Sequence, residues 1–403
     1  MNKKTVIILL LALVAVVGQA QVKCHIKGEL RDTTKGNTVI LCPTEVDLRV
    51  SDNYITTKAD AKGRFSFDVE TDKIGLYKVF LHEQYKSGSW SYKNFIVENN
   101  ATVSLLFDDD KWTVNSDGYE QMKKMKMDAE AERLYISKMD SLMTDVMKEL
   151  QPRIEELQRQ GKDPREDTLS MKRYQEFQVE NHKLYHQYKV WEYEYYKAHP
   201  MLFALYDIAN QMQSKDEEYD EKVTALMNLY HSTYENYHPD NPIHNTIHAL
   251  ETGWKQTPGN PYIDFEVLTA EGERVNVASL YQGKVAVIDL WASWCGPCRK
   301  HSKELIPLYE KYKKLGFVVI GIAREEEVSR MTQAAEKDGY PWQNYIDLKD
   351  ELKVWQKNGL AFSGGGMFLI DRNGTILSTS TDADELEPLI RKALGLSDEA
   401  QEK

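Results

Sequence analysis

Two cysteines separated by two residues are the part of this sequence best suited to chemistry. Cys295 and Cys298 lie in the stretch VIDLWASWCGPCRKH. The continuous apolar run KVAVIDL precedes them, and Pro297 between them suits the first turn of a helix because proline needs no backbone donor there. The pattern therefore predicts a buried strand followed by a helix that begins at the cysteines.

A cysteine at the start of a helix is a competent nucleophile. The partial positive charge and the unpaired N–H groups of the helix N-terminus favour the thiolate, which lowers the pKa of the thiol. A second thiol one helical turn further along can attack the mixed disulfide that forms. We therefore expect Cys295 to be the accessible, attacking thiol and Cys298 to be the resolving one. A static disulfide and half of a zinc site are the alternatives.

The other two cysteines of the chain, Cys24 and Cys42, lie far from this motif in the sequence. Both fall in runs of β-forming residues, with a turn near Lys35-Gly36-Asn37 between them. A hairpin with that turn would bring the two thiols close together, although a disulfide needs Cα atoms within about 7 Å. We therefore expect a structural disulfide between Cys24 and Cys42, with two buried free thiols as the alternative.

Residues from Pro261 to about Leu394 resemble the TlpA/ResA-type periplasmic thiol-disulfide oxidoreductases, and VIDLWASWCGPCRK is similar to the active-site segment of thioredoxins. The stretches PYIDFEVLTAEGERVNVASLYQGK before the motif and MFLIDRNGTIL after it support the resemblance. It covers about a third of the chain and implies a thioredoxin-like α/β domain. The segments further upstream resemble, less specifically, the region that often precedes such domains in secreted Gram-negative proteins.

The resemblance also implies roles for individual residues. Cys295 is the attacking cysteine, and Cys298 is the resolving one. Asp289 matches the buried acid that exchanges a proton with the resolving cysteine, and burial in an apolar strand raises the pKa of a carboxyl towards neutrality. Trp294 forms part of the exposed surface beside the nucleophile, where it is expected to contact the substrate.

Two positions depart from the family pattern. His301 stands where these redoxins often carry an acid. In AFSGGGMFLID, Gly365 occupies the position of the family's cis-proline, so Gly365 and Gly366 are expected to face the substrate. Glycine cannot fix φ, so we expect a trans loop with more freedom and slow, poorly selective reduction of generic disulfides. The alternative is a loop that makes room for one bulky partner.

The N-terminus has the pattern of an export signal. Lys3 and Lys4 precede an apolar run over 6–17, and the small residues Gly18 and Ala20 offer a cleavage site after Ala20. The apolar run is shorter than the about 20 residues that a membrane-spanning helix needs. We therefore expect a signal peptide and a mature protein in the periplasm, where disulfides can form.

The pattern of the whole chain indicates a multidomain protein. Short β-rich runs separated by turn residues come first, then apolar residues at helical spacing, then alternating strands and helices. The aromatic stripe of the helical region is expected to be a core seam, and a surface for a homodimer is the alternative. The expected order is a signal peptide (1–20), an antiparallel β-sandwich (21–112), a region built on an α-helical hairpin (113–255), the thioredoxin-like domain (256–397) and a tail (398–403).

Composition and motifs limit the partners. The net charge of −12 argues against nucleic acid. We expect no cofactor and no metal site, since the histidine pairs at four-residue spacing lack a third ligand. The expected partners are disulfide-containing secreted proteins and a membrane thiol donor, and the Gly-Pro dipeptide favours a reductase. Two other functions stay open: a binding or assembly module with a weakly active redoxin domain, and, ranked lower, a thiol peroxidase.

Overall fold

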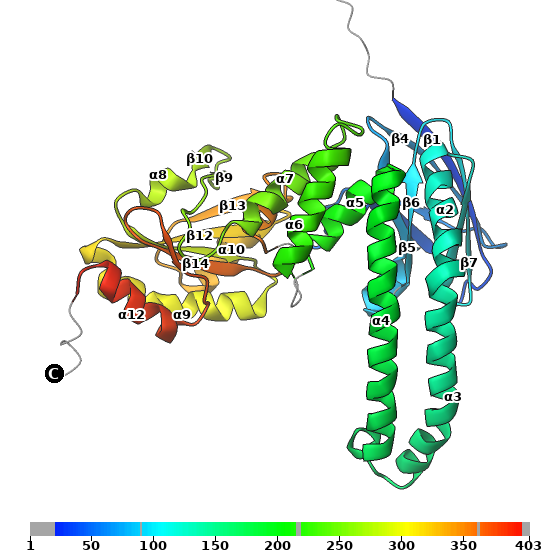
Figure 1. The fold of residues 1–403 in the computed structure, drawn as a ribbon. Coiled ribbons are helices and arrows are strands. Elements are labelled where there is room, and N and C mark those ends of the chain that lie inside the picture. The colour runs from blue at the N-terminus through cyan, green and yellow to red at the C-terminus, as the bar shows by residue number, and fades with distance from the viewer. Residues whose placement is uncertain (1–20, 89–90, 215–218, 361–362, 397–403) are drawn as a thin grey trace, which may run out of the picture.

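The computed structural model describes residues 21–88, 91–214, 219–360 and 363–396. The signal peptide expected over 1–20 lies outside these residues. Within the described ranges, no helix has the length and apolar character needed to cross a membrane. Figure 1 shows three parts: paired sheets near the N-terminus, a long pair of helices, and a C-terminal sheet flanked by helices.

The N-terminal part contains two four-stranded sheets, with strand orders β4-β1-β7-β8 and β3-β2-β5-β6. Their inward side chains share one hydrophobic cluster, which includes Ile26 and Phe107 from the first sheet and Leu41 and Val79 from the second. The elements are β1 (Val22–Leu30), β2 (Thr38–Pro43), β3 (Ile55–Lys58), β4 (Arg64–Thr71), β5 (Gly75–Leu81), α1 (His82–Ser87), β6 (Tyr92–Val97), β7 (Thr102–Asp108) and β8 (Lys111–Ser116).

Two expectations about this part are wrong. The strands are not all antiparallel, because β1 and β7 pair in parallel. The strand region also continues past the expected boundary at residue 112, because β7 and β8 form a tight hairpin. Asp109 and Asp110 make its turn with φ of 48° and 57°, the positive values that a two-residue hairpin loop requires.

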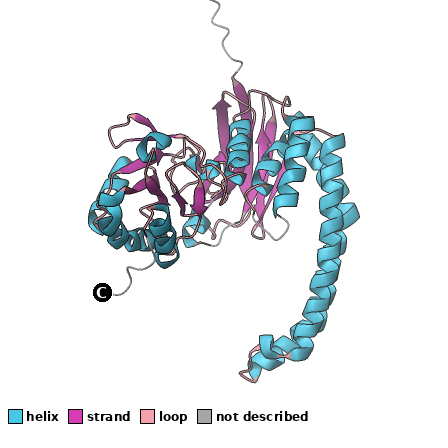
Figure 2. Cartoon of the chain, turned by 60° about the vertical axis from the view of Figure 1, so that its left-hand side comes forward, coloured by secondary structure: helices cyan, strands magenta, loops and turns pink. Residues whose placement is uncertain are grey.

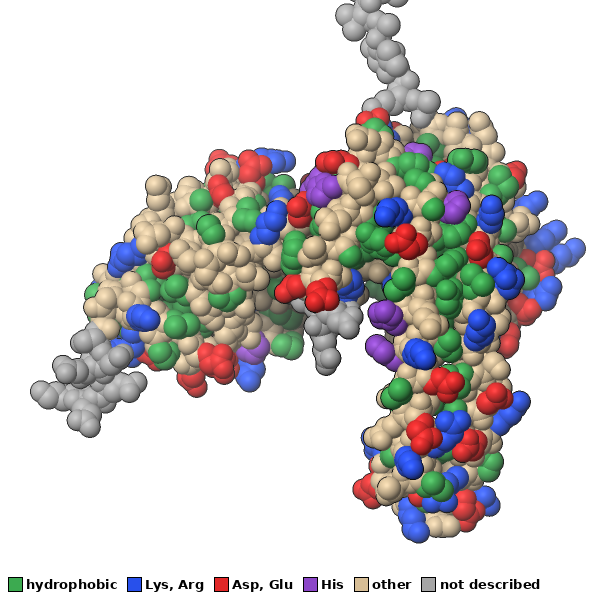
Figure 3. Space-filling model, viewed as in Figure 1, with side chains coloured by type: hydrophobic (Ala, Val, Ile, Leu, Met, Phe, Trp, Pro, Cys, Tyr) green, Lys and Arg blue, Asp and Glu red, His purple; other side chains and the backbone are tan. Residues whose placement is uncertain are grey.

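The helical part is dominated by two long helices. Helices α3 and α4 lie side by side and project away from both N-terminal sheets (Figures 1 and 2). The 31 residues of α4 correspond to a length of about 46 Å. Charged side chains of both signs are interspersed over the far end of this pair (Figure 3). The elements are α2 (Tyr119–Ala131), a π-helical turn (Glu132–Ile136), α3 (Ser137–Arg159), a 3₁₀ turn (Pro164–Glu166), α4 (Thr168–Ala198), α5 (Leu202–Gln211), α6 (Tyr219–Leu229), a second π-helical turn (Tyr230–Tyr234) and α7 (Ile243–Trp254).

Helices of this part cover the second N-terminal sheet. Leu76 of β5 and Ile96 of β6 belong to the same hydrophobic cluster as Leu205 of α5 and Ile247 of α7. The cluster therefore packs the second N-terminal sheet directly against the helices.

The C-terminal part is a seven-stranded mixed sheet with the order β10-β9-β13-β12-β11-β14-β15. Side chains of the central strand β11 alternate between two cores: Val285 and Val287 pack with α9 and α12, whereas Ala286 and Ile288 pack with α8 and α11. The elements are β9 (Glu266–Leu268), β10 (Arg274–Asn276), α8 (Val277–Tyr281), β11 (Val285–Trp291), α9 (Gly296–Tyr312), a 3₁₀ turn (Lys313–Leu315), β12 (Phe317–Glu325), α10 (Val328–Asp338), β13 (Asn344–Leu348), α11 (Val354–Lys357), β14 (Gly366–Ile370), β15 (Ile376–Ser378) and α12 (Ala383–Ala393).

The helical part also packs directly on the C-terminal sheet domain. Gly253 of α7 lies so close to the carbonyl oxygen of Gln356 and the nitrogen of Gly359 that a Cβ at position 253 would overlap both. Glycine is the residue that permits this backbone-to-backbone approach. The two parts therefore meet at a packed contact between α7 and α11.

Candidate active site

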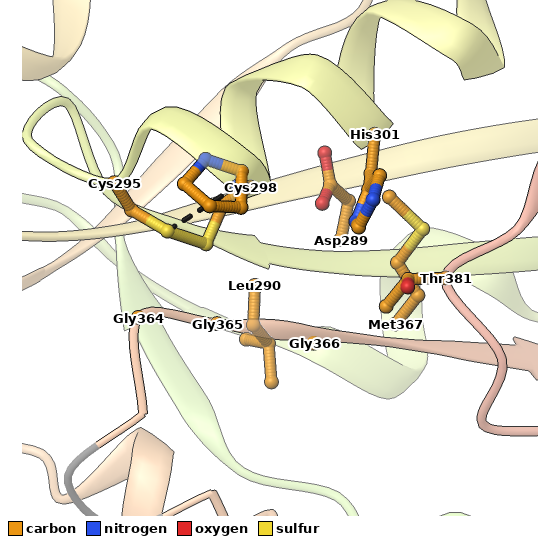
Figure 4. Close-up of a pocket in the computed structure, with 11 residues that line it drawn as sticks. Asp289, Leu290, Cys295, Cys298, His301, Gly364, Gly365, Gly366, Met367 and Thr381 are labelled. Carbon is orange, nitrogen blue, oxygen red and sulfur yellow. Dashed lines mark hydrogen bonds between the residues drawn. A yellow bond between two sulfur atoms is a disulfide. The ribbon is translucent and has the colours of Figure 1, made fainter. Parts of the chain in front are cut away.

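Cys295 and Cys298 lie where the chain leaves β11 and begins α9 (Figure 4). Cys295 is the N-cap residue of α9, and its Sγ accepts a hydrogen bond from the Cys298 N–H at 3.3 Å. The two sulfurs form a disulfide, with the Cα atoms 5.4 Å apart. The predicted strand, turn and helix are confirmed, and the helix N-terminus is in position to stabilise a thiolate on Cys295 once the disulfide is reduced.

Asp289 lies on β11 beside the disulfide and lines the same cavity. Its side chain is buried, and its Oδ2 has no hydrogen-bond partner among the described residues. Burial raises the pKa of this carboxyl to about 7, and the nearby Ser302 hydroxyl partly opposes the rise. The raised pKa expected from the sequence is confirmed, and the carboxyl can take up or release a proton near neutrality.

The turn before Cys295 is held by a buried acid that the motif did not reveal. Glu325, at the end of β12, is fully buried and accepts hydrogen bonds from the backbone N–H and the hydroxyl of Ser293. Burial raises the pKa of Glu325. Arg299 donates a hydrogen bond to the Ser293 carbonyl at 3.2 Å and pairs with Asp338 at 2.6 Å. These contacts hold the backbone of Ser293, two residues before Cys295.

The glycine loop lies directly against the disulfide. A Cβ at Gly364 would overlap the Sγ of Cys295, and a Cβ at Gly365 would overlap the carbonyl oxygen of Leu290 and lie 3.2 Å from the Sγ of Cys298. Gly366 begins β14, and the described peptide bonds include no cis bond. The glycines are thus required for close approach of the backbone to the sulfurs, a reason different from the conformational freedom expected above.

A cavity of about 310 Å³ opens beside the disulfide. It brings together the expected residues Asp289, Cys295 and Cys298 with Gly365 and Gly366 (Figure 4). Its other lining residues are Leu290, Pro297, His301, Gly364, Met367 and Thr381. Thr381 was not expected here because it lies in the turn after β15, far from the motif in the sequence.

The exposure of the two cysteines is the reverse of the expectation. Cys295 is 9 % exposed and counts among the buried residues, whereas Cys298 is only partly buried. Gly364 covers the Cys295 sulfur, and the guanidinium of Arg49 lies 4.4 Å from the ring centroid of Trp294 next to it. Trp294 is therefore partly buried, with one ring face occupied by a residue of the N-terminal part.

The expected Cys24–Cys42 disulfide is absent, because both cysteines are free and buried. Cys24 lies opposite Val69 in one N-terminal sheet, whereas Cys42 lies opposite Lys78 in the other. The residues around Lys35-Gly36-Asn37 connect the two sheets and do not form a hairpin. Cys24 faces the cluster that both sheets share and Cys42 packs in a separate one, so the thiols cannot meet.

Comparison with known proteins places the C-terminal part in a family. The model described as the AhpC/TSA family matches residues 258–379. The thiol-disulfide oxidoreductase ResA of Geobacillus kaustophilus is 27 % identical over 134 residues, which cover 33 % of this chain and 74 % of ResA. The Arabidopsis thaliana protein described as "Probable phospholipid hydroperoxide glutathione peroxidase 6, mitochondrial" is 28 % identical over 158 residues, which cover 33 % of this chain and 68 % of that protein.

A solved structure is also similar to part of this chain. The thiol:disulfide interchange protein from Bacteroides sp. is 22 % identical, and the TM-score is 0.33. The match covers 37 % of this chain and 97 % of that protein. The assignment therefore rests on the family model, on the sequence relatives and on the site geometry described above. The C-terminal part of this chain is a thioredoxin-like domain of the AhpC/TSA type, similar to the domain of the ResA thiol-disulfide oxidoreductases.

Proposed function

We propose that this protein is a periplasmic thiol-disulfide oxidoreductase that exchanges disulfides with secreted proteins through Cys295 and Cys298. The observation that carries the proposal is the disulfide between these residues at the N-terminus of α9, beside the buried carboxyl of Asp289. The ResA relatives carry the same class of activity in their name. The periplasmic location rests on the export signal expected from the sequence.

The reaction follows from the positions of these three side chains. In the reduced protein, the Cys295 thiolate attacks one sulfur of a substrate disulfide, which forms a mixed disulfide and releases one substrate thiolate. Asp289 accepts the proton of the Cys298 thiol, and the resulting thiolate attacks the Cys295 sulfur. This step closes the intramolecular disulfide and releases the second substrate thiolate. Two electrons have then passed from the cysteine pair to the substrate.

We propose that electrons flow towards the substrate. The dipeptide between the cysteines is the one found in thioredoxin, whose potential of about −270 mV makes it a reductant. A reductant in an oxidising compartment must be reduced again by a dithiol donor, and a membrane thiol donor facing the periplasm fits that need. We also propose that the two N-terminal sheets form a β-sandwich and that α3 and α4 form a helical hairpin. A homodimer through the hairpin stays a prediction.

Reduction of insulin by dithiothreitol, catalysed by the purified full-length protein, tests the proposed function. The wild type should accelerate precipitation of the insulin B chain, Cys295→Ser should abolish the effect, and Cys42→Ser should keep it. Cys42 is the matched control because it is also a cysteine but lies in a different part of the fold. A wild type that behaves like Cys295→Ser contradicts the proposal.

A thiol peroxidase is the second candidate, because the family model and the glutathione peroxidase relatives both point to peroxide chemistry. The stretch ASWC lacks the threonine that such a pocket uses upstream of its cysteine. Consumption of hydrogen peroxide in the presence of dithiothreitol separates the two activities. Inactivity in both assays would favour a binding or assembly module with a weakly active redoxin domain.

A further inference from the structure

The connection between β2 and β3, residues 44–54, reaches across to the redox site. We call it the docking segment. Within it, the Arg49 guanidinium lies over the ring of Trp294 at 4.4 Å, the geometry of a cation–π contact. Trp294 directly precedes Cys295 and is partly buried, and its indole nitrogen is buried without a hydrogen-bond partner among the described residues. A residue of the N-terminal part thus covers one face of the tryptophan next to the nucleophile.

A buried ion-pair chain anchors the docking segment to the C-terminal domain. Asp47 accepts hydrogen bonds from Arg49 at 2.6 and 2.9 Å, and its Oδ2 lies 3.2 Å from a guanidinium nitrogen of Arg324. Arg324 also pairs with Asp350 at 3.0 Å. The side chains of Asp47 and Arg324 are only 7 % and 1 % exposed, so separating the two parts would leave charges without partners.

The residue that binds the docking segment and the residue that binds the turn before Cys295 both lie at the end of β12. Arg324 and Glu325 are consecutive residues of β12, and consecutive side chains of a strand point to opposite sides. Arg324 holds the docking segment, while Glu325 holds Ser293 in the turn before Cys295. The position of the docking segment is therefore set relative to the disulfide by two adjacent residues of one rigid element.

The positive charge of Arg49 is already paired with Asp47, and this pairing decides how Arg49 can affect a substrate. Its guanidinium forms a two-point contact with Asp47 while it stacks on Trp294. A balanced guanidinium is a weak site for an anionic substrate group. Arg49 therefore affects the access of substrates to Cys295 through its size and its planar contact with the Trp294 ring.

We propose that the docking segment determines specificity by limiting which disulfides reach Cys295. Pro297, His301 and Thr381 line the cavity beside the disulfide, whereas Arg49 covers one face of Trp294, the residue directly before Cys295. Small disulfides and disulfides on an extended chain pass through this cavity, and disulfides flush with the surface of a folded protein do not. The inference rests on the proposed function and names the substrate class for that site.

Alkylation of Cys295 by two maleimides of different size tests the proposal in the full-length, reduced protein. Cys298→Ser is the parent, so Cys295 is the reactive thiol of the pair. Arg49→Ala should raise the rate with a polyethylene-glycol maleimide by about fivefold, the scale expected from losing one cation–π contact, and leave the rate with N-ethylmaleimide within about twofold. Arg49→Lys keeps a cation over the ring and should give a smaller rise.

The matched control is Arg64→Ala. Arg64 makes a similar pair with Asp60, at 2.9 and 3.0 Å, but lies on β4 in the other N-terminal sheet. Circular dichroism checks that each variant is folded, and Arg49→Gln replaces Arg49→Ala should the alanine variant not fold. Equal alkylation rates for Arg49→Ala and Arg64→Ala with the large reagent overturn the proposal. An alkylation rate of Arg49→Ala that rises equally with the large and the small reagent also overturns it. Because alkylation needs no turnover, an inactive enzyme would refute the proposed function and leave this test intact.

Discussion

Two pairs of cysteines in this chain differ in their bonding and in their surroundings. Cys295 and Cys298 lie one helical turn apart at the start of α9 and form a disulfide. Cys24 and Cys42 lie on strands of different sheets and are both free. Burial raises the pKa of each of these two thiols to about 11.

The difference shows which features make a cysteine pair reactive. Both pairs are largely shielded from solvent, so burial alone does not separate them. The first pair has a helix N-terminus, a carboxyl of raised pKa and a cavity beside it. The second pair packs in hydrophobic clusters of the N-terminal part and lies on strands. A thiol in such surroundings behaves as a small apolar side chain and stays protonated.

The largest expected effect is the difference in alkylation rate between the two pairs. In the reduced protein at pH 7, Cys295 should react with iodoacetamide about a thousandfold faster than Cys24 or Cys42, because a thiol with a pKa near 11 is about 10⁻⁴ ionised. Peptide mass spectrometry of samples quenched over time gives the rates. In urea all three cysteines should react at similar rates, which is the control. Similar rates in the folded protein would contradict the predicted difference between the two pairs.

The next effect concerns the resolving step. Cys298→Ala should lower turnover by roughly a hundredfold, as removal of one member of a catalytic unit does. Mixed disulfides between Cys295 and substrate should accumulate, because no neighbouring thiol can release them. Non-reducing gels detect these adducts, and Cys42→Ala is the control that should show none. Normal turnover in Cys298→Ala would mean that another thiol resolves the intermediate.

A smaller effect is expected from Asp289, whose pKa is raised to about 7 by burial. In the proposed mechanism its ionised form is the base for Cys298, so the rate of resolution should fall as the pH drops below about 7. Asp289→Asn should slow this step by at least about tenfold at pH 7 and remove the inflection from the pH profile. Stopped-flow measurement of tryptophan fluorescence follows the step. A profile that keeps its inflection in the variant would assign it to another group.

The smallest effect is expected in the second pair. Cys42→Ser places a hydroxyl in the cluster formed with Ile40 and Phe80 and should lower the free energy of unfolding by about 1–2 kcal/mol. Turnover should not change. Urea denaturation followed by circular dichroism measures the loss. A loss of 3 kcal/mol or more, the scale expected for removal of a disulfide, would instead indicate that Cys42 is disulfide-bonded in solution.

Several features of the site could be predicted from short stretches of sequence. The apolar run before Cys295 predicted β11, the cysteine spacing with Pro297 predicted the start of α9, and the single acid in the run predicted a carboxyl of raised pKa. Each of these depends on neighbours within a few residues, where side-chain type and backbone geometry are directly linked.

Other features depend on residues that are distant in the chain, and the tertiary structure alone decided them. Whether Cys24 and Cys42 meet depends on which strands pair, and β2 pairs with β3 and β5 and not with β1. Whether Trp294 is open to substrate depends on Arg49, which approaches from another domain. The sequence by itself determined the strand, the helix and the position of the cysteine pair at the start of that helix, because local physics suffices for them. Pairing between strands and docking between domains were decided by long-range packing, which no local pattern encodes.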